Sequence, residues 1–160
     1  MQMFSHGIMT GLFFAVVGMV YDRAHTREIS KLGGFFKKMP WAGVGFIIGG
    51  LVSMGMPGFS GFIAEFPIFM GVWRVQPVVA IIAALGIVIT AAYILLVVRR
   101  VFFGQMPAEL AEQVTNVSVL DKVAIGLLSL IMVALGWFPS LMVPMVQSGV
   151  NYILALLGGA

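Results

Sequence analysis

The stretch Trp41–Trp73 constrains the fold most strongly, because it is apolar almost throughout and carries one charged side chain, Glu65. An unbroken helix of this length would measure about 50 Å, whereas the hydrocarbon core of a bilayer is about 30 Å thick. Pro57 and Gly58 precede Glu65, and Pro67 follows it. Proline removes a backbone donor and interrupts helices, and glycine loosens the backbone. We therefore expect a helix break formed by Pro57, Gly58 and Pro67.

Composition places the chain in a membrane. Of the 160 residues, 61% are hydrophobic and 9% are charged, whereas a soluble domain carries about a quarter charged residues. We predict an all-α, polytopic transmembrane helix bundle of about four spans, one of them a broken helix. The spans are expected at about 1–22, 41–73 (broken near 55–67), 78–99 and 121–143, all in a single membrane domain, 1–160. Since each span takes about 20 residues, no room remains for a soluble catalytic domain.

Two arrangements of residues 41–73 are open: two passes with a turn at Pro57 and Gly58, or one pass broken into two halves. A single pass puts the basic loops 22–40 and 99–122 on the same side of the membrane. Two passes would put them on opposite sides. Because basic loops gather on the cytoplasmic side, the sequence favours one broken pass. Ser118 and Asp121 form a capping-box pattern that predicts the start of the last span.

Several kinds of chemistry are excluded by residue type. The chain has no cysteine, so it can form neither disulfides nor cysteine-ligated zinc or iron–sulfur sites. Two histidines are too few for most metal cages, and we predict no metal site. No Walker loop, dinucleotide fingerprint or nucleophile triad is present, so we predict no catalytic residue. The basic residues lie at the ends of apolar runs, as topology signals do, and no nucleic-acid partner is expected. The chain start also lacks the features of a signal peptide.

Glu65 and His6 are the candidate functional residues. A charge at the centre of a spanning helix costs about 2.5–3.5 kcal/mol on insertion scales, so such a group stays protonated or faces a hydrated interior. Glu65 therefore suits the loading and release of protons. His6 lies in the first apolar run, and histidine can relay protons near neutral pH. The alternatives are structural: Glu65 could bond the backbone that the prolines free, and His6 could be a neutral imidazole bonded to a neighbouring helix.

Three stretches resemble a known protein family. They are Ser5-His6-Gly7, the loop Tyr21–Glu28 (Tyr-Asp-Arg-Ala-His-Thr-Arg-Glu), and Met54-Gly-Met-Pro-Gly58 followed by Phe62-Ile-Ala-Glu-Phe66. Together they resemble the C-terminal part of subunit M of the bacterial NADH-quinone oxidoreductase, respiratory complex I, which is equivalent to the fourth membrane-encoded subunit of the mitochondrial enzyme. The resemblance implies two inverted five-helix repeats, each with a broken helix, of which this chain supplies the last four helices.

The resemblance also implies a function. Members of the family translocate protons in the membrane arm, coupled to NADH oxidation and quinone reduction in other subunits. Carried over, Glu65 would be a terminal proton site and His6 a relay on the hydrophilic axis, whereas His25 matches a family motif without being a proton site. The chain itself would hold no redox centre or cofactor: NADH, FMN, iron–sulfur clusters and quinone would belong to partner subunits. Its partners would be the lipid bilayer, protons and other membrane subunits of complex I, in the inner (plasma) membrane of a bacterium.

One departure and two rival functions stay open. Family members are several times longer, and the first repeat with its glutamate–lysine pair is absent here, so we expect that this chain does not pump alone. One rival is a subunit of a multi-subunit cation/proton antiporter or membrane-bound hydrogenase, which share the fold. The other is a structural membrane segment that helps assembly, as the small residues Gly7, Gly11 and Gly18 on one helix would permit.

Overall fold

Every regular element is helical within residues 1–158, the part of the chain that the computed structural model describes. In chain order the elements are α1 (Gln2–Ala24), η1 (Ile29–Lys31), α2 (Phe35–Lys38), α3 (Pro40–Ser53), α4 (Ser60–Val75), α5 (Pro77–Val97), η2 (Val98–Phe102), α6 (Ala108–Gln113), α7 (Val119–Trp137), η3 (Pro139–Leu141) and α8 (Val143–Leu156). The prediction of an all-α protein is confirmed.

Among the residues that the structure describes, three helical segments are long and apolar enough to cross a bilayer: α1, α7 and the continuous run Pro77–Phe102, which joins α5 to the π-helical turn η2. The helices α3 and α8 are apolar but shorter. The helices α3 and α4 are the two halves of the expected broken helix. Together these elements make a multi-pass membrane protein, as the composition indicates.

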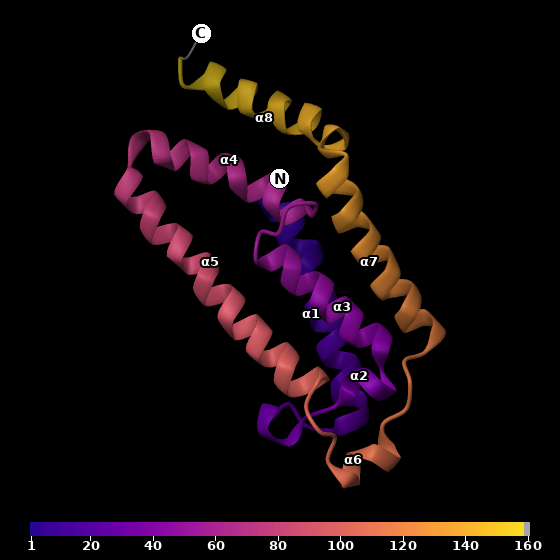
Figure 1. Cartoon of the computed structure of the whole chain (residues 1–160). Coiled ribbons are helices and arrows are strands. Elements are labelled where there is room, and N and C mark those ends of the chain that lie inside the picture. Colours follow the sequence, from indigo (N-terminus) through magenta and orange to yellow (C-terminus); the bar gives the residue numbers. More distant parts are fainter. Residues whose placement is uncertain (159–160) are drawn as a thin grey trace.

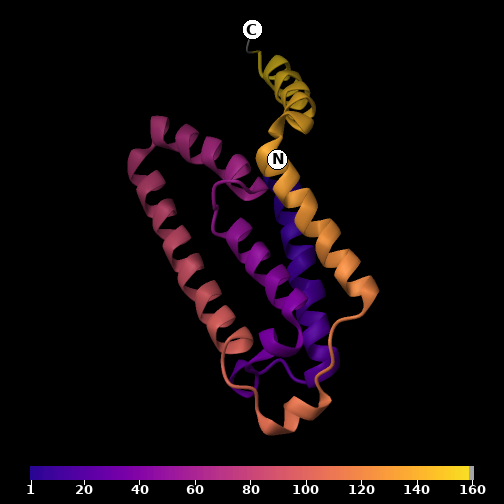
Figure 2. The ribbon, with the colours of Figure 1, turned by 45° about the vertical axis from the view of Figure 1, so that its right-hand side comes forward.

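The core lies among α1, α3 and α7, which run alongside one another in Figures 1 and 2. Its centre is formed by side chains that are almost completely buried, Leu12 and Val16 of α1, Ala42 of α3, and Ile125 and Met132 of α7. The helix α5 stands to one side and is connected to the core through α4 at one end and η2 at the other (Figure 2). Most of its large apolar side chains are exposed, so this helix faces lipid or another protein.

The two basic loops lie at the same end of the bundle, below α3 and α5 in Figure 1. Gly33 and Gly34 of the first loop pack directly on the backbone of Gln105 and Met106 in the second, leaving no room for a side chain at either glycine. This common position agrees with a single broken pass made by residues 41–73. It is the arrangement that the charge distribution favours.

The C-terminal helix α8 was not anticipated from the sequence. The last span expected from the sequence ends at residue 143, and Pro144, the next residue, lies in the first turn of α8. Proline is tolerated there because its missing N–H would have no partner within the helix. Most of the large apolar side chains of α8 are exposed.

Candidate functional site

The break between α3 and α4 begins with a well-formed helix end. The backbone N–H of Gly55 donates to the carbonyl of Val52 at 3.1 Å, and that of Met56 donates to Leu51 at 3.0 Å. This pair of bonds is a Schellman motif, which requires a left-handed residue at the position of Gly55. Gly55 has φ +64°, a conformation that glycine adopts without a steric penalty. The sequence therefore stops α3 at a defined residue.

Two of the three predicted break residues lie in the break, and the third does not. Pro57 and Gly58 fall between the helices, and Gly58 has φ +96°. Pro67, by contrast, lies inside α4, which continues to Val75. A proline removes one helical hydrogen bond, and a helix whose neighbouring turns are held can continue through it.

The break is held by backbone packing against two helices. A Cβ added to Gly136 of α7 would collide with the carbonyl of Gly58 and would lie 2.6 Å from the Cα of Phe59. A Cβ added to Gly61 would collide with the carbonyl of Val52 at the end of α3. At both positions, the neighbouring backbone can come this close only because glycine has no side chain. Gly136 gave no signal in the sequence, because it lies in an ordinary apolar run.

Glu65 lies on α4 and is half-buried. Its Oε1 accepts a hydrogen bond from Nε2 of Gln2 on α1 at 2.8 Å. Its Oε2 lies over Gly55, where an added Cβ would be 2.9 Å away. One turn further along α1, the hydroxyls of Ser5 and Ser60 are hydrogen-bonded at 2.7 Å and both residues are buried. The two contacts fix α4 against α1, and the glycine in the break leaves space for the carboxylate.

Two cavities meet at Glu65. The first, of about 400 Å³, is apolar and lies between α4 and α5, with Phe66 and Trp73 among its lining residues. The second, of about 310 Å³, also borders α5 and has Ser53 and Thr90 among its lining residues. Glu65 is the charged residue in the lining of both. A carboxylate between an apolar and a more polar cavity can exchange a proton with water that enters from the polar side.

His6 lies apart from Glu65 and is exposed in this chain. It lines a third cavity of about 430 Å³ together with Thr10, Tyr93 and Ser53. Ser53 therefore borders both this cavity and the second cavity beside Glu65. Among the described residues, no direct hydrogen bond joins His6 to Glu65. The structure thus places the two predicted residues on neighbouring cavities that share one serine.

The chemistry available here is proton exchange. Across residues 1–158, no group of three histidine, cysteine, aspartate or glutamate side chains is placed to hold a metal ion. The site offers one carboxylate, one amide and several hydroxyls around spaces large enough for water. The residues present do not fit an iron–sulfur cluster, because the chain contains no cysteine.

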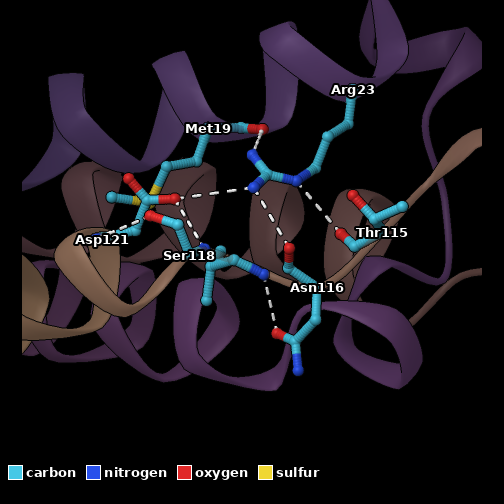
Figure 3. A network of polar contacts seen from close by, with 7 residues as sticks. Met19, Arg23, Thr115, Asn116, Ser118 and Asp121 are labelled. Atoms are coloured by element: carbon cyan, nitrogen blue, oxygen red, sulfur yellow. Dashed lines mark hydrogen bonds and ion pairs between the residues drawn. The ribbon is translucent and has the colours of Figure 1, made fainter.

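A second polar cluster lies at the other end of α1, around Arg23 (Figure 3). Its Nε donates to the carbonyl of Thr115 at 3.1 Å, Nη1 to Met19 at 2.9 Å and Nη2 to Asn116 at 3.2 Å. Nη2 also lies 3.5 Å from Oδ2 of Asp121. The guanidinium therefore fastens the segment before α7 to the end of α1.

The predicted capping box at the start of α7 is confirmed. The Ser118 hydroxyl accepts from the backbone N–H of Asp121 at 3.2 Å, and the Asp121 carboxylate accepts from the backbone N–H of Ser118 at 2.9 Å. Because Asp121 also faces Arg23, the cap and the arginine cluster form one structural unit. It lies too far along α1 to belong to the site around Glu65.

Comparison with known proteins gives relatives over nearly the whole chain. The NADH-quinone oxidoreductase subunit M of Rhodobacter capsulatus is 35% identical over 153 residues, which cover 96% of this chain and 30% of that protein. A chain of respiratory complex I from Thermus thermophilus with bound NADH superposes with a TM-score of 0.76 and 29% identity, covering 84% of this chain and 28% of its own. A chain of the membrane-bound sulfane sulfur reductase, an archaeal respiratory membrane complex, also gives a TM-score of 0.76, with 28% identity over 82% of this chain and 22% of its own.

This chain therefore spans about a third or less of the length of these relatives. The resemblance to subunit M seen in the sequence is confirmed by the relative from Rhodobacter. The profile of the family described as "NADH:quinone oxidoreductase/Mrp antiporter, TM" matches residues 1–90, more than half of the chain. That match includes α1, the break and Glu65. The chain belongs to the NADH:quinone oxidoreductase/Mrp antiporter family of transmembrane proteins.

Proposed function

We propose that this chain is part of an antiporter-like membrane subunit that translocates protons, with Glu65 as a proton-transfer site and His6 as a relay. The observation that carries the proposal is the position of Glu65: half-buried beside a helix break, hydrogen-bonded from another helix, and bordered by two cavities. Ionisable groups beside broken helices are how membrane proteins commonly build ion and proton sites.

The cavities suggest a route for the proton. Water in the second cavity would reach Glu65 past the hydroxyls of Ser53 and Thr90, and the third cavity would continue from Ser53 to His6. A change in the break around Gly55 and Gly58 would alter the surroundings of the carboxylate, because Gly55 lies directly beside Oε2 of Glu65. Protonation from one side and release to the other could then alternate.

The relatives support a proposal for the partners of this chain. We propose that the chain works with other membrane subunits of a complex I-type assembly in a bacterial plasma membrane. NADH oxidation and quinone reduction would take place in partner subunits that hold FMN and iron–sulfur clusters. Because the chain spans about a third or less of its relatives, transport would also require the remaining part of such a subunit.

A second function is supported by the description of the family, which joins the quinone oxidoreductases with the Mrp antiporters. A subunit of a cation/proton antiporter would use the same carboxylate but exchange protons for another cation. Proton transport that requires Na⁺ and proceeds without NADH would favour this alternative. Proton uptake that depends on NADH and is indifferent to Na⁺ would favour the complex I-type function.

The test is Glu65→Gln in the assembled complex, in sealed vesicles, with NADH-driven quinone reduction and proton uptake recorded together. Glutamine preserves the size of the side chain and its bond from Gln2 but cannot carry the proton. We expect proton uptake to fall by at least tenfold and electron transfer to slow with it, since positioned acid–base groups contribute about 10²–10⁴-fold.

Glu109→Gln is the matched control, because Glu109 is an exposed carboxylate on the short helix α6. This variant should retain normal uptake and turnover. Equal amounts of assembled complex in both variants would exclude an assembly defect. Normal pumping at normal turnover in Glu65→Gln would refute the proton-site role and leave Glu65 as a structural carboxylate.

A further inference from the structure

The side-chain amide of Gln2, which donates to Glu65, uses one of its two polar atoms. Gln2 donates from Nε2 to Glu65, yet its Oε1 is buried and has no hydrogen-bond partner among the described residues. Buried polar atoms normally have partners, so an exception calls for an explanation. Its place on the same amide that donates to Glu65 gives this acceptor a use in the other charge state of the carboxyl group.

The amide group carries both a donor and an acceptor on one planar carbon. Half a turn about its last side-chain bond exchanges Nε2 with Oε1, and this torsion has a broad, roughly two-fold preference. An ionised carboxylate only accepts hydrogen bonds, whereas a protonated carboxyl group also donates one. The buried Oε1 is therefore the acceptor that a protonated Glu65 would need.

The position of the backbone permits this exchange. On α1, Gln2 contacts Glu65 of α4, and Ser5, three residues further on, contacts Ser60 of α4. The hydrogen bond of 2.7 Å between the two serine hydroxyls holds the helices in register. Because the oxygen and nitrogen of an amide are similar in size, the turned amide would occupy nearly the same space, and the exchange requires no shift of α1 or α4. The two cavities border Glu65 itself, so the carboxyl group also has free volume beside it.

No other ionisable group competes for Glu65 among the residues that line its two cavities. The end of α3, the break and α5 contribute apolar residues, together with the hydroxyls of Ser53 and Thr90. On α1, His6 faces the third cavity. The charged residues Asp121 and Lys122 of α7 lie at the opposite end of the bundle, near Arg23.

We propose that Gln2 is a positioning residue that holds Glu65 in both of its charge states by turning its amide. With Glu65 ionised, Nε2 donates to the carboxylate. With Glu65 protonated, Oε1 accepts the carboxyl O–H. The carboxyl group then stays in place through a transport cycle, and its alignment with the second cavity is preserved. This inference rests on the proposed function and deepens it, since it assigns a residue that keeps the proton site aligned.

The test is infrared difference spectroscopy of the assembled membrane complex, titrated with pH, on wild type, Gln2→Met, Glu65→Gln and Gln76→Met. Methionine resembles glutamine in length but lacks the amide. Bands that vanish in Glu65→Gln belong to Glu65, and an amide carbonyl band that vanishes in Gln2→Met belongs to Gln2. Gln76 joins α4 to α5 and is exposed, so Gln76→Met is the matched control for the substitution itself.

We expect the Gln2 carbonyl band to move to lower frequency when Glu65 becomes protonated, because the carbonyl then accepts a hydrogen bond. In Gln2→Met, the carboxyl band of protonated Glu65 should move to higher frequency. Proton uptake should fall roughly 10- to 100-fold, since a misplacement of about 1 Å can cost about 10²-fold. Gln76→Met should change neither. A Gln2 carbonyl band that ignores the charge of Glu65, or a Gln2→Met complex with normal uptake, would overturn the proposal.

The failure of this inference and the failure of the proposed function have different signatures. If Glu65 carries no transported proton, Glu65→Gln pumps normally, while the infrared bands still report whether the amide turns. If Glu65 does carry the proton but Gln2 does not position it, Glu65→Gln loses uptake and Gln2→Met retains it.

Discussion

The two polar clusters at opposite ends of α1 are each built around a charged side chain that contacts another segment, but they differ in how many partners that side chain has. All three nitrogens of the Arg23 guanidinium donate to backbone carbonyls, and Asp121 adds a countercharge. Glu65 receives one bond from Gln2, whose own carbonyl oxygen is buried without a partner in the described structure. Glu65 also borders two cavities, and Arg23 is not among the residues that line either of them.

The difference separates a structural cluster from one suited to chemistry. A guanidinium held by several bonds at once fixes one geometry, since any movement breaks several of them together. A carboxylate with a single neutral donor and free volume beside it can change its charge without dismantling its surroundings. We therefore expect substitutions near Arg23 to alter stability and substitutions near Glu65 to alter transport.

The largest effect is expected at Gly136, where α7 supports the break. Gly136→Val inserts a side chain into the backbone of Gly58 and Phe59, which cannot move aside as a flexible side chain could. Overpacking typically costs 1–3 kcal/mol, and we expect a loss of stability of about 3 kcal/mol here. The measurement is the unfolding midpoint of the detergent-solubilised protein, together with its amount in membranes.

Gly126→Val on the same helix is the control, because nothing lies within 4 Å of an added Cβ there. The two variants make the same substitution in the same helix and differ in what the new side chain meets. Equal stability of the two variants would mean that α7 does not hold the break. The break could then not be regarded as the fixed frame of the site around Glu65.

A smaller effect on stability but a selective one on transport is expected from Gly55→Ala. Alanine at φ +64° pays roughly 1–2 kcal/mol for a left-handed conformation. Its Cβ would also lie 2.9 Å from Oε2 of Glu65 and displace the carboxylate. Proton uptake in vesicles should fall further than the amount of assembled complex does.

Gly158→Ala separates strain from displacement, because Gly158 also has a positive φ of +74° but nothing lies within 4 Å of its added Cβ. This control should leave uptake unchanged. If Gly55→Ala reduced uptake only in proportion to the amount of assembled complex, the proximity of Gly55 to Glu65 would be irrelevant to transport.

The parts of the fold that follow from local chemistry could be predicted from the sequence. The helical class and the break at Pro57 and Gly58 follow from apolar length and from the backbone preferences of proline and glycine. The capping box at Ser118 and Asp121 depends on residues three apart and was equally accessible. The prediction that Pro67 belongs to the break is wrong, since it lies inside α4. Whether a helix continues through a proline is decided by the neighbouring turns and helices and not by the residue alone.

The candidate site could be predicted only in part. Glu65 stands out because a charge in an apolar run is rare. Its partner Gln2 is 63 residues away along the chain, and nothing local marks a glutamine at the start of an apolar helix as the donor to a carboxylate. Gly136 is hidden for the same reason, since its role depends on which backbone packs against it. The relation between His6 and Glu65 required the cavities that share Ser53.

The smallest effect that still discriminates between the clusters is expected from Arg23→Lys. Lysine keeps the charge but loses the planar fork that reaches the carbonyls of Thr115 and Asn116 together with Asp121. We expect a loss of stability of about 1 kcal/mol, close to the net value of one or two hydrogen bonds. NADH-driven proton uptake per assembled complex should stay normal.

Glu28→Gln serves as the matched control for charge pairing alone. Glu28 pairs with Lys31 at 2.8 Å, but both side chains are more than half exposed, and such surface pairs contribute about 0–1 kcal/mol. The unfolding midpoint should therefore fall for Arg23→Lys and stay nearly constant for Glu28→Gln. A loss of proton uptake in Arg23→Lys at normal assembly would break the comparison. It would mean that the cluster around Arg23 also takes part in transport, and that a larger number of partners does not mark a purely structural role.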